Sequence, residues 1–183
     1  MKSVKSLFSK SLSLIALTTC FALFTTVPTN AFLDDKFKQE VETEKVAVKL
    51  VRDVQKAGYN LVTTEELKSW IDSKKEMVIV DTMPYEDSYK KSHIPGAVQF
   101  LFPIPDMNNW ETKETDGKTE EDFKKLLGSD LDKTVVIYCG FVKCTRSHNG
   151  AVWAKKLGYK NVYRYSGGIF AWKGAGFESE KVK

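Results

Sequence analysis

Two short apolar runs constrain the fold of this chain more than any other feature of its sequence. Met77–Val80 is uninterrupted and ends at Asp81, and Thr134–Tyr138 ends at Cys139. Such a pattern is typical of strands that are buried on both faces, as in parallel sheets covered by helices. The two runs therefore predict a parallel sheet inside an α/β domain.

The segments around these runs alternate between strand and helix patterns. Shorter strands are expected at Tyr59–Val62, Val98–Phe100 and Asn161–Tyr165. Apolar spacing and capping residues predict helices over 63–70, 85–91, 119–128, 147–157 and 168–173, and 101–117 is expected to be a long loop. The alternation predicts a doubly wound α/β fold, with a mostly parallel central sheet and helices on both faces.

Residues 1–31 have the pattern of a secretory signal peptide. A stretch with three lysines precedes an uncharged apolar run, and Thr29-Asn30-Ala31 offers small residues for cleavage. An uncleaved anchor helix is the main alternative, because about 17 apolar residues is the lower limit for crossing a bilayer. A lipoprotein site at Cys20 ranks third, because the apolar run continues past it. We expect a periplasmic or secreted protein, or a membrane-anchored one if the segment is not cleaved.

Removing this segment changes both the charge and the cysteine count. The whole chain of 183 residues has a formal net charge of +4 and three cysteines. About 152 residues remain, with a net charge near +1 and two cysteines, Cys139 and Cys144. No basic stripe interleaved with aromatic residues appears in the sequence, so nucleic-acid binding is not expected. In an oxidising compartment, the spacing of the two cysteines is compatible with a disulfide.

The mature chain is expected to begin with an amphipathic helix over 35–57, inside an extension of residues 32–58 that precedes the main domain, 59–183. Gly58 follows as a stop signal. The apolar residues recur at helical spacing among many charges: Phe37, Val41, Val48, Val51 and Val54. One stripe of this kind usually packs on its own domain as a strap, and a homodimer contact is the alternative.

Cys139 lies where a ligand is expected to bind. Ligands of open α/β sheets bind where loops leave the carboxyl ends of the strands, and Cys139 directly follows a predicted strand. The N–H groups of the loop and the N-terminus of the next helix favour a negative charge there. Lys143 and Arg146 add positive charge, so we expect a thiolate at Cys139, with a pKa below the ordinary value of about 8.5.

Further motifs follow in order along the chain. The C-terminal half contains Val-Val-Ile-Tyr-Cys at 135–139, Arg146-Ser147, the run 158–163 and Ser-Gly-Gly-Ile-Phe-Ala-Trp at 166–172. The N-terminal half contains Val80-Asp81 and, twelve residues after the aspartate, His-Ile-Pro-Gly-Ala at 93–97. Together these motifs resemble a rhodanese domain, from about Tyr59 to Phe177. The resemblance implies a doubly wound domain whose active-site loop takes sulfane sulfur onto a cysteine as a persulfide.

Sulfur chemistry and the resemblance together imply a sulfurtransferase. Cys139 would attack the outer sulfur of a small sulfur-containing anion, such as thiosulfate or polysulfide, and pass the sulfur to a thiol, cyanide or a protein acceptor. No metal or organic cofactor is expected. Asp81 and His93 would be supporting residues. The substrate would be bound by Gly140, Phe141, Val142, Lys143, Thr145 and Arg146.

The sequence departs from the family pattern at two places. Six residues separate Cys139 from Arg146, where the usual sulfurtransferase loop has four and the related dual-specificity phosphatases have five. We therefore expect a wider or differently folded loop. Met83 stands where the family often has an arginine two residues after the aspartate, which removes one supporting contact.

Cys144 has three possible roles. It could resolve a Cys139 persulfide by thiolate attack, releasing sulfide and leaving a disulfide between the two cysteines. It could itself be the primary nucleophile, because it is nearer to Arg146 and to the helix N-terminus. It could also be a small loop residue without chemistry.

The two histidines are expected to have structural rather than catalytic roles. His93 should fix the turn before Pro95-Gly96 by hydrogen bonding, and His148 should be a solvated helix residue rather than a proton shuttle. A metal site at Cys139, Cys144 and His148 is not expected, because the spacing does not match a familiar zinc site.

The tryptophans and phenylalanines named next are classed by their surroundings. Trp153 and Trp172 lie among apolar residues on predicted helices and should be in the core. Trp110 and the stretch 100–102 are candidates for lining an acceptor pocket.

Three function classes follow. An exported sulfurtransferase is preferred, and a non-enzymatic rhodanese-like module that carries sulfur or binds a partner is the alternative. A phosphatase-like activity is the weakest, because the Cys-to-Arg loop is long and no acid is evident.

Overall fold

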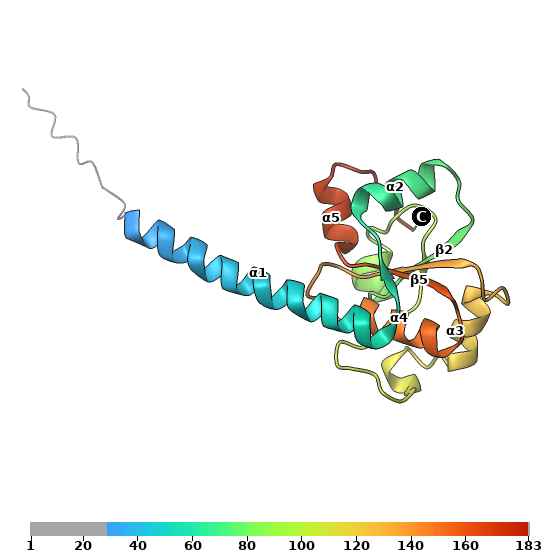
Figure 1. The fold of residues 1–183 in the computed structure, drawn as a ribbon. Coiled ribbons are helices and arrows are strands. Elements are labelled where there is room, and N and C mark those ends of the chain that lie inside the picture. Colours follow the sequence, from blue (N-terminus) through green and yellow to red (C-terminus); the bar gives the residue numbers. More distant parts are fainter. Residues whose placement is uncertain (1–28, 183) are drawn as a thin grey trace, which may run out of the picture. The chain divides into compact units, whose positions relative to one another are not determined.

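A computed structural model describes residues 29–182 of the chain (Figure 1). Residues 1–28, which include most of the predicted signal peptide and Cys20, lie outside the described residues. The chain divides after Lys38, and the compact unit from Gln39 onward contains the sheet and every contact of the site.

Five parallel strands form one central sheet in the order β1-β5-β4-β2-β3. The strands are β1 Asn60–Leu61, β2 Met77–Asp81, β3 Val98–Gln99, β4 Thr134–Tyr138 and β5 Asn161–Tyr165. The register pairs Asp81 with Tyr138 and Tyr138 with Tyr165, so the three central strands end at the same level. This common end is the carboxyl edge of the sheet, and residue 139 begins the loop that leaves it.

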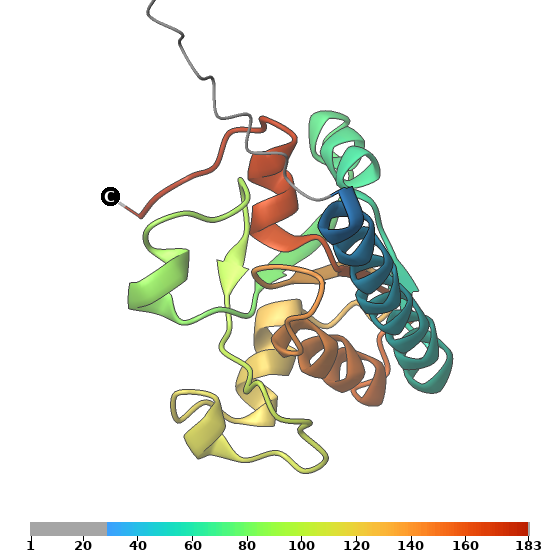
Figure 2. The same cartoon turned by 90° about the vertical axis from the view of Figure 1, so that its left-hand side faces the viewer.

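Helices cover both faces of the sheet, as Figures 1 and 2 show. On one face, α2 (Thr64–Asp72) and α5 (Gly168–Gly174) contribute Leu67, Ile169 and Trp172 to a buried cluster. On the other face, α3 (Glu120–Leu127) and α4 (Arg146–Lys156) contribute Phe123, Leu127, Trp153 and further residues to a second cluster. The predicted doubly wound α/β fold is therefore confirmed, and so is the core position of the two tryptophans.

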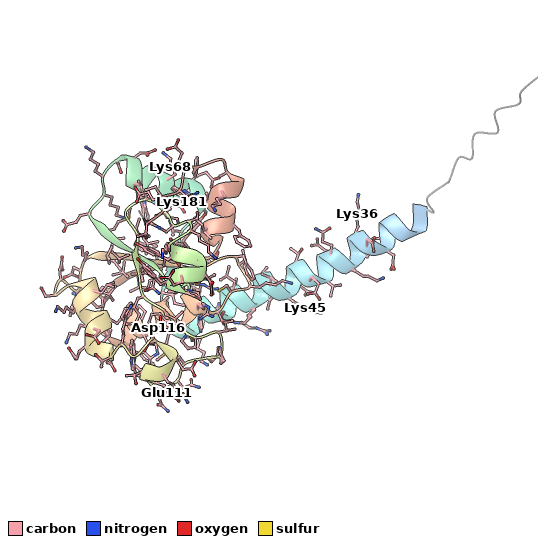
Figure 3. All side chains as sticks on the ribbon, turned by 180° about the vertical axis from the view of Figure 1, so that it is seen from behind. Lys36, Lys45, Lys68, Glu111, Asp116 and Lys181 are labelled. Atoms are coloured by element: carbon pink, nitrogen blue, oxygen red, sulfur yellow. The ribbon has the colours of Figure 1, made fainter. Side chains whose placement is uncertain are left out.

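The start signals in the sequence account for two of these helices. Thr63 caps α2 and Thr119 caps α3, each with its side chain accepting from the N–H three residues on. The side chains of Glu66 and Asp122 accept from the cap N–H groups in return, which completes a capping box at both helices. Short turns of π-helix (Tyr85–Tyr89) and 3-10 helix (Thr112–Glu114) lie in the connections. The exposed connections carry charge, for example at Glu111 and Asp116 (Figure 3).

The N-terminal helix, α1, spans Thr29–Ala57 and ends at Gly58, which has a φ of +70°. A positive φ suits glycine, so the predicted stop is confirmed. Val54 and Ala57 pack against the second core cluster, whereas Val41, Val48 and Val51 are exposed. The last turns of α1 therefore pack on the domain as a strap, and the homodimer contact stays a prediction. Among residues 29–182, no helix is long and apolar enough to cross a membrane.

Candidate active site

The candidate site is the loop Cys139–Thr145, between the end of β4 and the start of α4. The first turn of α5 holds the beginning of this loop: the N–H groups of Ile169 and Phe170 donate to the carbonyls of Cys139 and Gly140, each at 3.0 Å. Gly168 makes this approach possible. A Cβ at Gly168 would lie 2.2 Å from the Cys139 carbonyl oxygen, and its φ of +61° is also one that suits glycine.

Cys139 is completely buried beneath the loop. Its Sγ lies 3.4 Å from the carbonyl oxygen of Cys144, 3.9 Å from that of Phe141 and 3.2 Å from the Ser147 hydroxyl. Carbonyl oxygens carry partial negative charge, so they accept from a thiol and repel a thiolate. Burial raises the pKa of Cys139 well above its ordinary value. The expectation of a lowered pKa at Cys139 is therefore wrong, because burial outweighs the hydrogen bonds from the Ser147 hydroxyl and N–H, which act in the lowering direction.

Cys144 has the environment that was expected for Cys139. Its side chain is partly exposed, and its pKa is lowered to about 6. A hydrogen bond from the Cys139 side chain is the largest cause, and hydrogen bonds from the backbone N–H groups of Arg146 and Gly140 add to it. The charge of Arg146 lowers the pKa further. The lowered pKa favours the thiolate form of Cys144, which lies one residue before the N-cap of α4.

The two basic residues of the loop have partners of their own. Lys143 Nζ lies 3.6 Å from a carboxylate oxygen of Glu42 on α1. The Arg146 guanidinium donates to the carbonyl of Phe102, and the neighbouring Thr145 hydroxyl donates to that of Ile104. Arg146 thus fixes the start of α4 while its charge still acts on Cys144, whereas Lys143 is turned toward α1.

The remaining predicted binding residues lie along the same loop. Gly140 is buried, and Phe141 and Val142 are exposed at the tip of the loop. The Phe141 ring lies against the ring of Phe170 on α5, with centroids 5.6 Å apart. A cleft of about 250 Å³ lies between the loop and α1, and both sequence neighbours of Cys144 line it, together with Lys45, Lys49 and Arg164.

Arg164 on β5 is a site residue that the sequence analysis missed. It is 2% exposed, and it donates to the carbonyl of Cys144 at 2.9 Å and to that of Val142 at 3.3 Å. It also donates to the Ser147 hydroxyl at 3.0 Å. An arginine within a predicted strand of the central sheet was the available signal, because a charge that becomes buried needs partners. This arginine binds the second half of the loop to the sheet.

His148 is not the solvated residue that was expected. Its side chain is 13% exposed, and its Nδ1 lies 2.9 Å from the Tyr59 hydroxyl and 3.9 Å from Asp53. Burial lowers the pKa of His148. Asp53 also lies 3.7 Å from Arg164. The last turns of α1, the first turn of α4 and β5 therefore meet in one polar cluster behind the loop.

Asp81 lies at the carboxyl edge of the sheet, paired with Tyr138, and His93 lies in the connection between β2 and β3. Asp81 is fully buried at the end of β2 and accepts from the Met83 N–H at 2.9 Å, while its second oxygen has no hydrogen-bond partner among residues 29–182. Burial raises the pKa of Asp81 to about 6. His93 is hydrogen-bonded to the Tyr89 carbonyl at 2.8 Å and stacks on the Tyr89 ring. The turn-fixing role predicted for His93 fits these contacts.

The sequence suggested an acceptor pocket lined by aromatic residues, and it predicted no metal site. Phe100 and Phe102 are buried in the second core cluster, and Trp110 packs against it, so these rings do not line an acceptor pocket. Within the part of the chain that the structure describes, no group of three or more His, Cys, Asp or Glu side chains could hold a metal ion.

Curated relatives match part of this chain. A tRNA uridine(34) hydroxylase of Anaplasma phagocytophilum is 28% identical over 149 residues, which cover 74% of this chain and 47% of the relative. A probable adenylyltransferase/sulfurtransferase MoeZ of Mycobacterium tuberculosis is 29% identical over 119 residues, which cover 64% of this chain and 26% of the relative. The chain thus spans about half or less of the length of these curated relatives.

A solved structure and a family match complete the comparison. The crystal structure of a Bacillus halodurans protein resembles this fold with a TM-score of 0.54 at 21% identity, covering 74% of this chain and 87% of that one. The rhodanese-like domain family matches residues 63–175, more than half of the chain. This chain therefore belongs to the rhodanese-like domain family.

Proposed function

We propose that this chain is a sulfur-transfer enzyme in which Cys144 carries the sulfur as a persulfide. One contrast carries the proposal: Cys139 is fully buried with the carbonyl oxygens of Phe141 and Cys144 facing its sulfur, whereas Cys144 is partly exposed and its pKa is lowered. A thiolate is the nucleophilic form of cysteine. The geometry therefore favours the second role considered for Cys144 in the sequence, that of primary nucleophile, over the assignment to Cys139.

The proposed reaction has two steps. The Cys144 thiolate attacks the outer sulfur of a donor such as thiosulfate, the S–S bond of the donor breaks, and sulfite leaves with the electron pair. The N–H groups around Cys144 and the charge of Arg146 stabilise negative charge at this point. An acceptor thiolate or cyanide then attacks the outer sulfur of the persulfide and releases the Cys144 thiolate. Each step transfers one sulfur atom and needs no additional base.

Cysteine replacement tests the assignment. Steady-state transfer from thiosulfate to cyanide is measured for the wild type, Cys139→Ser and Cys144→Ser, with hydrolysis of a simple phosphate ester measured beside it. We expect Cys144→Ser to abolish sulfur transfer and Cys139→Ser to retain it. Retained transfer in Cys144→Ser with loss in Cys139→Ser would contradict the assignment, and turnover of the phosphate ester alone would contradict sulfur transfer.

A sulfur carrier without steady-state turnover is the second candidate. Lys143 is paired with Glu42, and the Arg146 guanidinium donates to Phe102, so both basic side chains of the loop have other partners than an incoming anion. This arrangement favours loading from a persulfide or polysulfide over loading from thiosulfate. Mass spectrometry that finds a persulfide on Cys144 without thiosulfate-to-cyanide turnover would identify the carrier.

Export is proposed on the sequence of residues 1–31 alone. A basic start, an apolar run and small residues near Ala31 support a cleaved signal peptide. The intact mass of the protein recovered from the periplasm or medium of an expressing cell tests this. A mass that begins near residue 32 is expected, and a full-length chain in the membrane fraction would support the anchored alternative.

A further inference from the structure

The thiol of Cys139 lies against the backbone of Cys144, the other cysteine of the loop. Cys139 is directly beneath the second half of the loop, with its Sγ 3.4 Å from the backbone oxygen of Cys144. The Cys139 side chain also acts on the Cys144 thiol, and it is the largest cause of the lowered pKa of Cys144. Both are free thiols, and they are the only cysteines among residues 29–182. A sulfur bound to Cys144 would therefore have a second, protonated thiol within reach.

A buried hydrogen-bond chain leads from a positive charge to Cys139. Arg164 Nε donates to the Ser147 hydroxyl at 3.0 Å, and that oxygen lies 3.2 Å from Cys139 Sγ. A guanidinium is a donor only, so the Ser147 oxygen accepts from it and keeps its own proton to give to the sulfur. Negative charge that develops on Cys139 is thus stabilised by the hydroxyl and, through it, by Arg164.

Burial restricts what this second thiol can react with. Cys139 is 0% exposed, so a donor or acceptor from solution meets Cys144 first. Cys144 is the other cysteine of the same loop, so its sulfur is the reaction partner that this placement favours. These contacts suit an internal reaction between the two cysteines rather than a second site for external substrates.

We propose that Cys139 is a resolving thiol, which attacks the inner sulfur of a Cys144 persulfide and releases the outer sulfur as hydrogen sulfide. A bond forms between the two cysteine sulfurs, the S–S bond of the persulfide breaks, and the outer sulfur leaves with the electron pair. The proton of the Cys139 thiol ends on the released sulfide. The sulfane sulfur is reduced and the two cysteines are oxidised to a disulfide, so the atoms and electrons balance. A dithiol reductant from solution then restores both thiols.

This inference rests on the proposed function, because the persulfide on Cys144 is its substrate. It adds a second activity, dithiol-dependent release of sulfide, which competes with transfer to an acceptor. The roles are the reverse of those considered from the sequence, where Cys144 was the candidate for resolving a persulfide on Cys139.

The test is a single turnover of the full chain without acceptor. Fully reduced protein is mixed with one equivalent of inorganic polysulfide, and free sulfide and the intact mass are followed after acid quenching. For the wild type, we expect sulfide release and a final chain lighter by two hydrogen atoms, with a Cys139–Cys144 disulfide in the peptide map. In Cys139→Ser, the chain should stay heavier by one sulfur atom, with sulfide release slowed about tenfold or more.

Ser147→Ala tests the hydrogen-bond chain. Loss of a hydrogen bond to a charged group should slow sulfide release about tenfold while the persulfide forms. Cys139→Ala serves as a second variant, and thermal unfolding of each variant shows whether it is folded. The peptide map of the wild type needs no variant, so the disulfide is tested even if the substitutions prevent folding.

The outcomes separate the two proposals. A wild-type chain that keeps its persulfide, releases no sulfide and forms no disulfide would overturn the resolving role and leave sulfur transfer by Cys144 intact. A persulfide that forms on Cys139 in Cys144→Ser, and on no residue in Cys139→Ser, would overturn the proposed function instead.

Discussion

Replacing Cys139 by alanine should raise the pKa of Cys144. The Cys139 side chain is the largest cause of the lowered pKa of about 6 at Cys144. A hydrogen bond to a charged group contributes about 1.5–3 kcal/mol, and 1.36 kcal/mol corresponds to one pKa unit, so its loss should move the titration upward by about 1–2 pH units. Cys139→Ser keeps a hydroxyl donor and should move it less.

Alkylation by iodoacetamide measures this titration, because only the thiolate reacts. Because its pKa is lowered, Cys144 in the wild type should react faster at pH 7 than a free thiol, of which about 3% is ionised. The rate is followed from pH 5 to 9 on the peptide that contains Cys144, by mass spectrometry. For the wild type, we expect the rate to reach half of its maximum near pH 6. For Cys139→Ala, we expect this midpoint near pH 7 or above. A wild-type midpoint of pH 8 or higher, or equal midpoints in both chains, would refute this account of the loop.

Three more predictions concern the residues around the loop. Burial raises the pKa of Asp81 to about 6, so protonation of Asp81 stabilises the folded state. This stabilisation is complete below about pH 4 and is lost as pH rises through about 6. It amounts to about 3 kcal/mol. Asp81→Asn should therefore flatten the dependence of urea stability on pH between 4 and 7, and an unchanged slope would contradict the reasoning. Gly168→Ala places a Cβ 2.2 Å from the Cys139 carbonyl oxygen at a positive φ, and should lower the free energy of unfolding by about 2 kcal/mol or more, measured by urea denaturation; a loss under about 0.5 kcal/mol would show that α5 moves freely. Arg164→Met leaves the carbonyls of the loop and Asp53 without their buried partner and should cost about 3 kcal/mol or more, whereas a stability close to that of the wild type would mean that water replaces the guanidinium.

The sequence by itself determined the fold. Uninterrupted apolar runs at β2 and β4, capping residues at Thr63 and Thr119, and a glycine stop at Gly58 are local signals, and the structure has a strand or a helix boundary at each of them. The loop after β4 could also be located from the sequence, because parallel strands place their carboxyl ends at one edge of the sheet.

The arrangement of the two cysteines in the loop depends on contacts that form only in the folded domain. Which backbone groups face a sulfur depends on the path of the loop. That path is set by α5 on one side and by Arg164 on the other, and both lie more than twenty positions after Cys139 in the sequence. A separation of 89 positions between His148 and Tyr59 likewise concealed the contact of His148 with Tyr59 and Asp53. Spacing indicates which residues share a loop, whereas the charge state of each thiol depends on long-range contacts that no local pattern encodes.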